Sequence, residues 1–323
     1  MSLIYIGQQI TIYGGIFIFI TGSSGNLMSI LVFSSVHNYR TTPCTFYFLI
    51  ASIFNIIYLA NNLISRIVST GYGIDLTKTS VSWCKLRVYI GNSVTLISLS
   101  CSCLATIDQF FVTSRNANRR RFSNIKLTYR ILLIISLISC LHGIPILLFY
   151  NISSITKTCI DTNPGYAIYT PIYGTVVLCF IPVIIMIIFG YLTYYNINSI
   201  RILTEQQADR QLIRMILSQA ISAFITFIPY GINIAYSQIT SNISKDSYRL
   251  NIESFISMMT TLLSYIYYAA NCYIFLMSSN RFRRKVKARI LFCFRPNQVD
   301  PSQMGVAGIR TIDKRTRNRT KNL

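Results

Sequence analysis

Long apolar stretches separated by short charged segments dominate the chain. Six segments contain no Asp, Glu, Lys or Arg, namely residues 1–39, 41–65, 131–156, 162–200, 215–244 and 254–280. A seventh apolar stretch, between Arg87 and Arg115, has Asp108 as its only charge. A spanning helix needs about 20 apolar residues, and a charged side chain at its centre costs about 2.5–3.5 kcal/mol. The pattern therefore predicts seven transmembrane helices, at about residues 11–34, 44–68, 85–113, 128–150, 168–198, 209–238 and 252–278.

The composition supports an integral membrane protein of one domain. Hydrophobic residues make up 52% of the chain and charged residues 12%, about half the usual charged share of roughly 25%. The first apolar run lacks a basic leader and is too long for a cleaved signal peptide, so we expect it to remain as a helix. The predicted organisation is a short extracellular N-terminus at 1–10, a helical bundle at 11–278, a surface helix at 280–294 and a basic disordered tail at 295–323.

The net charge of +21 follows the positive-inside rule rather than a nucleic-acid-binding pattern. One side of the predicted spans holds Arg40, Arg115, Arg119, Arg120, Arg121, Lys126, Arg201, Arg210 and the tail from Arg281 onward. The opposite side holds only Lys78, Lys85, Lys157, Lys245 and Arg249. We therefore expect a plasma-membrane protein with its N-terminus outside, lipid as its surroundings and no nucleic-acid partner.

Two glycosylation sequons agree with this orientation. Asn151 and Asn242 each begin an Asn-Ile-Ser sequence, and both fall in loops assigned to the outside. A third sequon, at Asn318, falls in the predicted cytoplasmic tail, where the modifying enzyme has no access. Only Asn151 and Asn242 are therefore expected to carry glycans.

Two of the nine cysteines differ from the rest in position. Cys84 opens the third predicted span on the outer side, and Cys159 lies in the outer loop after the fourth. Oxidation is permitted outside the cell, so we predict a disulfide between them. Most of the others lie within spans, where cysteine acts as a small apolar side chain.

A basic amphipathic segment follows the seventh predicted span. Phe282, Val286, Ile290 and Phe294 recur every four residues, with Arg and Lys between them. This spacing predicts an eighth helix lying on the inner leaflet. Cys293 near its end is either a palmitoylation site or an ordinary free thiol.

Together these features resemble the rhodopsin-like G-protein-coupled receptors. Gly25-Asn26 is similar to that family's first-span motif, and Asp108-Gln109-Phe110 stands 24 residues after Cys84, where the family has Asp-Arg-Tyr. Pro182, Pro229 and Asn271 resemble residues of its fifth, sixth and seventh spans, and Phe227 replaces the usual Trp before the sixth-span proline. The sequences YRTTP and SSNRFRRKV most resemble FMRFamide-receptor-like and other neuropeptide-receptor-like members of invertebrates.

The resemblance assigns roles to several polar residues. Asn55 stands where the family holds a sodium ion with an Asp, so we predict a neutral cluster of Asn26, Asn55, Ser98 and Asn271 that does not respond to sodium. Gln109 replaces the arginine that pairs with the preceding acid and contacts the G protein. Asp108 is then expected to pair with the loop arginines Arg119, Arg120 and Arg121, and this basic face to carry the attraction to a heterotrimeric G protein.

The predicted spans lack the charged residues that amine and retinal ligands require in this family. Gly91 stands seventeen residues before Asp108, where an amine receptor would need an acid, and the seventh predicted span has no Lys for retinal. A peptide ligand is therefore expected. Its charged groups are expected to meet Arg66, Arg87 and Glu253, unless these charges lie at the interface or pair with one another.

Other classes remain open. A receptor-like protein that no longer couples to G proteins is one alternative, because of Gln109, and a channel or transporter is another. A transporter is disfavoured by the odd span number and the absence of internal repeats. The two histidines, His37 and His142, lie at opposite ends of spans, and no metal, cofactor or nucleophile site is evident, so an enzyme is not expected.

Overall fold

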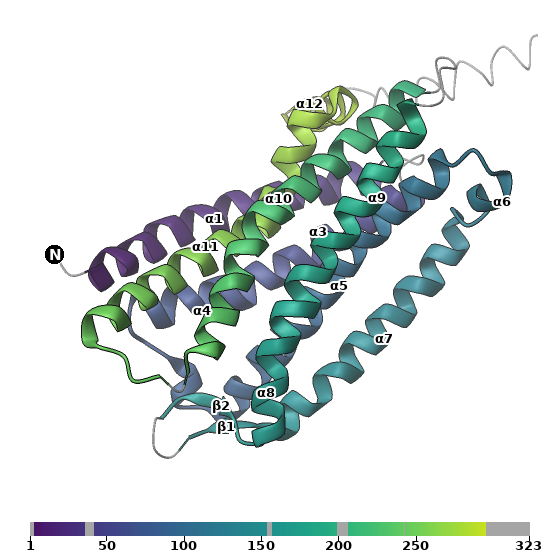
Figure 1. The fold of residues 1–323 in the computed structure, drawn as a ribbon. Helices are drawn as coiled ribbons and strands as arrows, with labels where there is room; N and C mark the ends of the chain where they lie inside the picture. The colour runs from purple at the N-terminus through teal and green to yellow at the C-terminus, as the bar shows by residue number, and fades with distance from the viewer. Residues whose placement is uncertain (1–2, 36–41, 154–156, 199–205, 242, 295–323) are drawn as a thin grey trace, which may run out of the picture.

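The chain folds into a bundle of long helices (Figure 1), of which the computed structural model describes residues 3–35, 42–153, 157–198, 206–241 and 243–294. The longer helices are α1 (Leu3–Ser35), α3 (Pro43–Tyr58), α5 (Val81–Thr113), α7 (Ile125–Phe149), α8 (Pro164–Tyr173), α9 (Ile181–Asn198), α10 (Gln206–Ile239), α11 (Ser247–Ser278) and α12 (Asn280–Phe294). The shorter elements are α4 (Ile64–Arg66), α6 (Ala117–Arg120), a 3-10 turn (Leu76–Lys78), and π-helical segments at Leu59–Leu63, Ile67–Gly71 and Gly174–Phe180. Strands β1 (Tyr150–Ile152) and β2 (Cys159–Asp161) form an antiparallel hairpin.

The protein is a multi-pass membrane bundle. Among the described residues, six continuous helices are long and apolar enough to cross a bilayer: Leu3–Ser35, Pro43–Gly71, Val81–Thr113, Ile125–Phe149, Pro164–Ile197 and Gln211–Ile239. Helix α11, the seventh predicted span, has 32 residues but is less apolar, because it contains five tyrosines and two asparagines together with several serines and threonines. The structure therefore confirms a predominantly helical membrane bundle with six clear spans, and α11 as a long helix packed among them.

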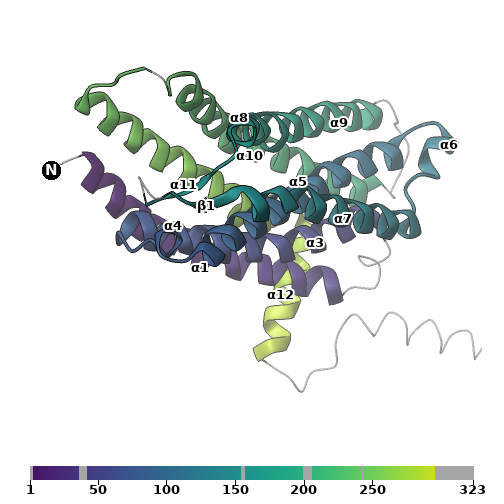
Figure 2. The same ribbon diagram turned by 90° about the horizontal axis from the view of Figure 1, so that it is seen from below.

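The helices run between two ends of the bundle. The N-terminus, the β-hairpin and the loop from α10 to α11 lie at one end, which we call the hairpin end (Figure 1). Helices α6 and α12 lie at the other, which we call the α12 end. Figure 2 shows α12 projecting steeply from the bundle rather than continuing α11. A helix over 280–294 is therefore present, whereas the tail at 295–323 lies outside the described residues.

Local sequence signals explain where several helices begin. The Ser80 hydroxyl accepts a hydrogen bond from the Trp83 backbone at the start of α5. The Asn163 side chain does the same for α8, where Pro164 occupies the first turn without losing a helical hydrogen bond. Helix α1 begins at Leu3, so residues 3–10, the greater part of the predicted short N-terminus, belong to the first helix. Gly7 lets this first part of α1 approach Met258 on α11 closely.

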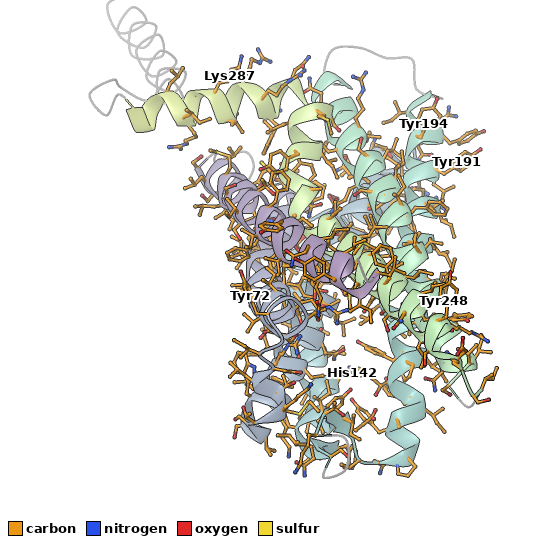
Figure 3. The ribbon with its side chains drawn as sticks, turned by 90° about the vertical axis from the view of Figure 1, so that its left-hand side faces the viewer. Tyr72, His142, Tyr191, Tyr194, Tyr248 and Lys287 are labelled. Atoms are coloured by element: carbon orange, nitrogen blue, oxygen red, sulfur yellow. A yellow bond between two sulfur atoms is a disulfide. The ribbon has the colours of Figure 1, made fainter. Side chains whose placement is uncertain are left out.

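Exposed apolar faces distinguish the outside of the bundle from its core. On α7, Leu133, Leu137, Leu141 and Leu148 are each more than half exposed, as expected for side chains that meet lipid. Tyr191 and Tyr194 lie toward the α12 end, whereas Tyr72 and Tyr248 lie toward the hairpin end (Figure 3). Exposed tyrosines near both ends are typical of the two membrane interfaces.

The core near the α12 end is aromatic. Phe33 of α1 packs against Phe48 of α3, with ring centroids 6.1 Å apart, and against Phe282 of α12, at 5.4 Å. Phe275 of α11 lies 4.8 Å from Phe48 and 5.8 Å from Phe282. These rings anchor the first turn of α12 against α1, α3 and α11. Arg283, Arg284 and Lys287 of α12 are exposed, whereas Arg289 donates a hydrogen bond to the Ser35 hydroxyl of α1 at 2.9 Å.

Candidate functional site

A cavity of about 320 Å³ lies among the helices in the half of the bundle nearer the hairpin end. Its walls come from α3, α5, α10, α11 and two π-helical segments. Its aromatic side includes Tyr58, Phe227, Tyr230 and Tyr268, and its polar side includes Asn62, Arg87, Asn92, Thr95 and Ser264. Volumes of about 300–1,000 Å³ with few polar groups are typical of small-molecule sites.

Two of the cavity walls are π-helical. Asn62 belongs to the segment Leu59–Leu63, and Leu178 and Cys179 belong to the segment Gly174–Phe180. The second segment ends two residues before Pro182, whose missing N–H disrupts the ordinary helical ladder. The Pro182 carbonyl accepts a weak hydrogen bond from the Cys103 thiol of α5, at 3.7 Å. Short π-helical segments within α-helices are frequently found at functional sites.

The three charges predicted to meet a ligand do not share one site. Arg87 lines the cavity, and its backbone carbonyl accepts a hydrogen bond from the Asn61 side chain at 2.9 Å. Arg66 lies half-buried on α4, close enough to influence Arg87 electrostatically. Glu253 lies elsewhere, in a second cavity of about 720 Å³ between α10 and α11 that Pro229 also lines.

The Glu253 carboxylate is bound by three neighbouring side chains. Its carboxylate forms ion pairs with Lys245 at 2.6 Å and with Arg249 at 2.9 Å. The Tyr236 hydroxyl donates a hydrogen bond to it at 2.8 Å. Glu253 therefore does not share the cavity that Arg87 lines. The alternative expectation, that Arg66, Arg87 and Glu253 pair with one another, is not met by Glu253 either, because its partners are Lys245 and Arg249.

Three of the four residues of the predicted neutral cluster are hydrogen-bonded to one another. The Asn26 amide donates to the Gly22 and Tyr268 carbonyls at 2.8 and 2.9 Å, and the Asn55 amide donates to Asn26 Oδ1 at 3.3 Å. The Ser98 hydroxyl donates to Asn55 Oδ1. Asn271 is also buried, but its Oδ1 has no hydrogen-bond partner among the described residues. The cluster therefore joins α1, α3, α5 and α11 through neutral groups.

A second buried polar contact was not predicted from the sequence. The Gln219 amide of α10 donates to the Ser102 hydroxyl of α5 at 3.0 Å and to the Tyr267 hydroxyl of α11 at 3.4 Å. Tyr267 packs on Phe227, with ring centroids 4.7 Å apart, and Phe227 lines the cavity. Gln219 is the one amide in the predicted sixth span between Met215 and Pro229, but the sequence did not reveal its partners.

Asn92 joins the cavity wall to α7 and α8. Its amide lies 3.3 Å from His142 Nδ1, and His142 Nε2 lies 2.7 Å from the Tyr169 hydroxyl. The His142 ring also stacks on Tyr173, with centroids 4.4 Å apart. His142, which lies toward the hairpin end in Figure 3, is thus held between helices as a structural contact.

The disulfide between Cys84 and Cys159 forms as predicted. It joins the first turn of α5 to strand β2, with Cα atoms 5.7 Å apart. In the hairpin, Ile152 lies opposite Cys159, and Asn151 is exposed, as a glycan acceptor needs to be. Burial raises the pKa of Tyr150 to about 12, so its phenol stays protonated. Asn242, the other predicted acceptor, lies outside the described residues.

At the α12 end, Asp108 has a different partner from the one predicted. Its Oδ1 accepts a hydrogen bond from the Ser123 hydroxyl at 2.6 Å, and the carboxylate is almost wholly buried. Neither of the two ion pairs among the described residues involves Asp108. The exposed Arg119 instead lies over the Phe110 ring, 5.8 Å from its centroid, and Arg120 and Arg121 are exposed as well. A hydrogen bond from Ser123 to the buried Asp108 carboxylate costs less free energy than an ion pair with an arginine, because no second charge has to lose its hydration.

Gln109 is buried beside this carboxylate. Only 1% of the side chain is exposed, and its Oε1 lacks a hydrogen-bond partner within the described ranges. Gln109 therefore faces the interior of the bundle in this conformation, whereas the three loop arginines face outward.

No group of three His, Cys, Asp or Glu side chains able to hold a metal ion occurs in the described part of the chain. No protein-family model matches the sequence, and no curated protein matches it. The features of the molecule that bear on its function are therefore the geometry of the cavity, the buried polar contacts and the distribution of charge.

Proposed function

We propose that this protein is a receptor of the rhodopsin-like, G-protein-coupled class that binds an extracellular peptide. In this reading α11 is the seventh span, the hairpin end faces the outside of the plasma membrane, and the α12 end faces the cytoplasm. Helix α12 then lies on the inner leaflet, where its basic side chains meet anionic lipid.

The observation that carries the proposal is a continuous path of contacts from the cavity toward the α12 end. Phe227 and Tyr268 line the cavity, and both rings pack on Tyr267, at 4.7 and 5.2 Å. Tyr267 shares the Gln219 amide with Ser102, which lies on α5 between the cavity and Asp108. A ligand that moves Phe227 would therefore disturb the contact that joins α5, α10 and α11.

The charge distribution supports the direction of signalling. Arg119, Arg120 and Arg121 are exposed at the α12 end, and α12 adds a further row of lysines and arginines. This face suits an acidic surface on a heterotrimeric G protein, since complementary charges raise association rates.

The proposal is tested in cells that express the full chain with a G-protein dissociation sensor. A peptide library is screened, and any active peptide is retested on a variant with Arg119, Arg120 and Arg121 changed to Glu. We expect at least one peptide to dissociate the G protein and the variant to respond much more weakly at equal surface expression. A variant that responds as well as wild type would contradict the role of the basic face.

A receptor-like protein that does not couple is the second candidate, and Gln109 favours it. The side chain is buried, and it stands where the family places a charged contact to the G protein. In that case peptides would bind to the purified protein but release no G protein. Solute flux into proteoliposomes tests the remaining alternative, a transporter or channel.

A further inference from the structure

The polar side of the cavity offers hydrogen-bond donors that have no acceptor. Arg87 is half-buried on the cavity wall, and neither ion pair found among the described residues involves it. Asn62 Nδ2 is buried and makes no hydrogen bond within the described part of the chain. A buried donor without a partner costs about 1–3 kcal/mol, and a charged one costs more. Both groups would gain from an acceptor placed in the cavity.

No acidic side chain lines the cavity to supply that acceptor. A carboxylate that influences Arg87 electrostatically belongs to Asp75, which does not line the cavity and whose Oδ1 already accepts from the Thr77 backbone and hydroxyl. Arg66 adds a second positive charge nearby. The cavity wall thus carries a cation, and no anion on the wall balances it.

Gly91 explains why the Asn62 amide can occupy this position. A Cβ atom on Gly91 would lie 2.8 Å from Asn62 Oδ1 and 3.0 Å from Nδ2, closer than atoms normally approach. The glycine of α5 thus leaves room for the amide of the π-helical segment. The same position cannot contribute a charge of its own, because glycine has no side chain.

We propose that the cavity binds a carboxylate of the ligand, held by the Arg87 guanidinium and the Asn62 amide. A planar guanidinium matches a carboxylate with two parallel hydrogen bonds, and the contact is strong where water is excluded. The remaining walls are aromatic and apolar, including Tyr58, Tyr230 and Leu178, so the carboxylate is carried by an aromatic or aliphatic body. This inference rests on the proposed function only in taking the cavity as the ligand site.

The test uses affinity selection with the full chain in lipid nanodiscs, so it needs no G protein. The probe is a tripeptide library made twice, once with a free C-terminal carboxylate and once with a C-terminal amide, and bound peptides are identified by mass spectrometry. We expect peptides with a free carboxylate to be retained at least tenfold above their amides. Amidated peptides that are retained should contain Asp or Glu, because a side-chain carboxylate would then bind in place of the C-terminal one.

Three variants test the assignment of residues. Arg87→Gln should abolish the preference for carboxylate, and Gly91→Ala should reduce retention by displacing the Asn62 amide. Arg249→Gln is the matched control, because it removes a cation at the hairpin end outside the cavity and should leave the preference unchanged. Thermal unfolding of each variant shows whether it is folded.

Equal retention of both libraries, a preference for basic peptides, or no retention of any peptide would overturn the proposal. A carboxylate preference that survives Arg87→Gln in a folded variant would overturn it as well. Retention that depends on Arg87 without any G-protein release would uphold the carboxylate site and refute only the coupling part of the proposed function.

Discussion

Replacing Gln219 with Leu tests the buried contact that joins α5, α10 and α11. Leu fills a similar volume but removes the donor to Ser102 at 3.0 Å and the longer one to Tyr267 at 3.4 Å. Only 2% of Gln219 is exposed, so water does not easily replace these bonds. We expect the variant to unfold more readily than wild type.

The expected loss in the free energy of unfolding is estimated from measured hydrogen bonds between membrane helices. These contribute about 0.6 kcal/mol on average and at most about 1.7 kcal/mol. The 3.0 Å bond has good length, whereas the 3.4 Å bond is long, so most of the effect should come from Ser102. A double-mutant cycle of Gln219→Leu and Ser102→Ala should therefore give a coupling energy of about 1 kcal/mol, or roughly fivefold in the unfolding constant.

The assay is reversible unfolding of the purified protein in mixed micelles, driven by added SDS and followed by circular dichroism. Thr226→Val is the control on the same helix, because Thr226 is buried but its hydroxyl donates only to the carbonyls of Ser222 and Ala223 within α10. It should show no coupling with Ser102→Ala. A coupling energy below about 0.3 kcal/mol for Gln219 and Ser102 would show that this hydrogen bond does not hold the helices together.

Three further predictions concern other parts of the bundle. Cys84→Ser should lower the free energy of unfolding by about 4 kcal/mol in the chain-entropy model, because the disulfide closes a sequence separation of 75 residues; reductant should destabilise wild type and leave the variant unchanged. Gly22→Ala should lower the melting temperature, because the added Cβ would lie 2.6 Å from Ala269 Cβ, whereas Gly174→Ala, with nothing within 4 Å, should be tolerated. Sodium should not change the melting temperature relative to potassium, since Asn55 is already bonded to Asn26 and Ser98; a sodium-specific rise would contradict the neutral cluster.

The apolar runs predicted the helices well, because a span must satisfy its backbone hydrogen bonds internally and must be long enough to cross the bilayer. The disulfide was also predictable, since only Cys84 and Cys159 were expected in the outer segments. The neutral cluster was partly predictable: Asn26, Asn55 and Ser98 are bonded, whereas Asn271 has no bond from its Oδ1 among the described residues.

Contacts that depend on helix rotation were not predictable. Faces toward lipid and toward the core are both apolar, so a run of hydrophobic residues does not show which face Gln219 occupies. The π-helical segments, one of which contains Asn62, have no clear sequence signal. The partner of Asp108 was predicted by charge, but packing places the Ser123 hydroxyl 2.6 Å from its carboxylate instead.

The central claim is that α11 crosses the membrane as a seventh span, so that the chain begins outside the cell and ends in the cytoplasm. An odd number of spans places the two ends of the chain on opposite sides, and six spans would place them on the same side. The measurement is antibody labelling of N-terminal and C-terminal tags on the full chain in intact and permeabilised cells. The account predicts that the N-terminal tag is labelled in intact cells and the C-terminal tag only after permeabilisation. Labelling of both tags in intact cells, or of neither, would contradict it.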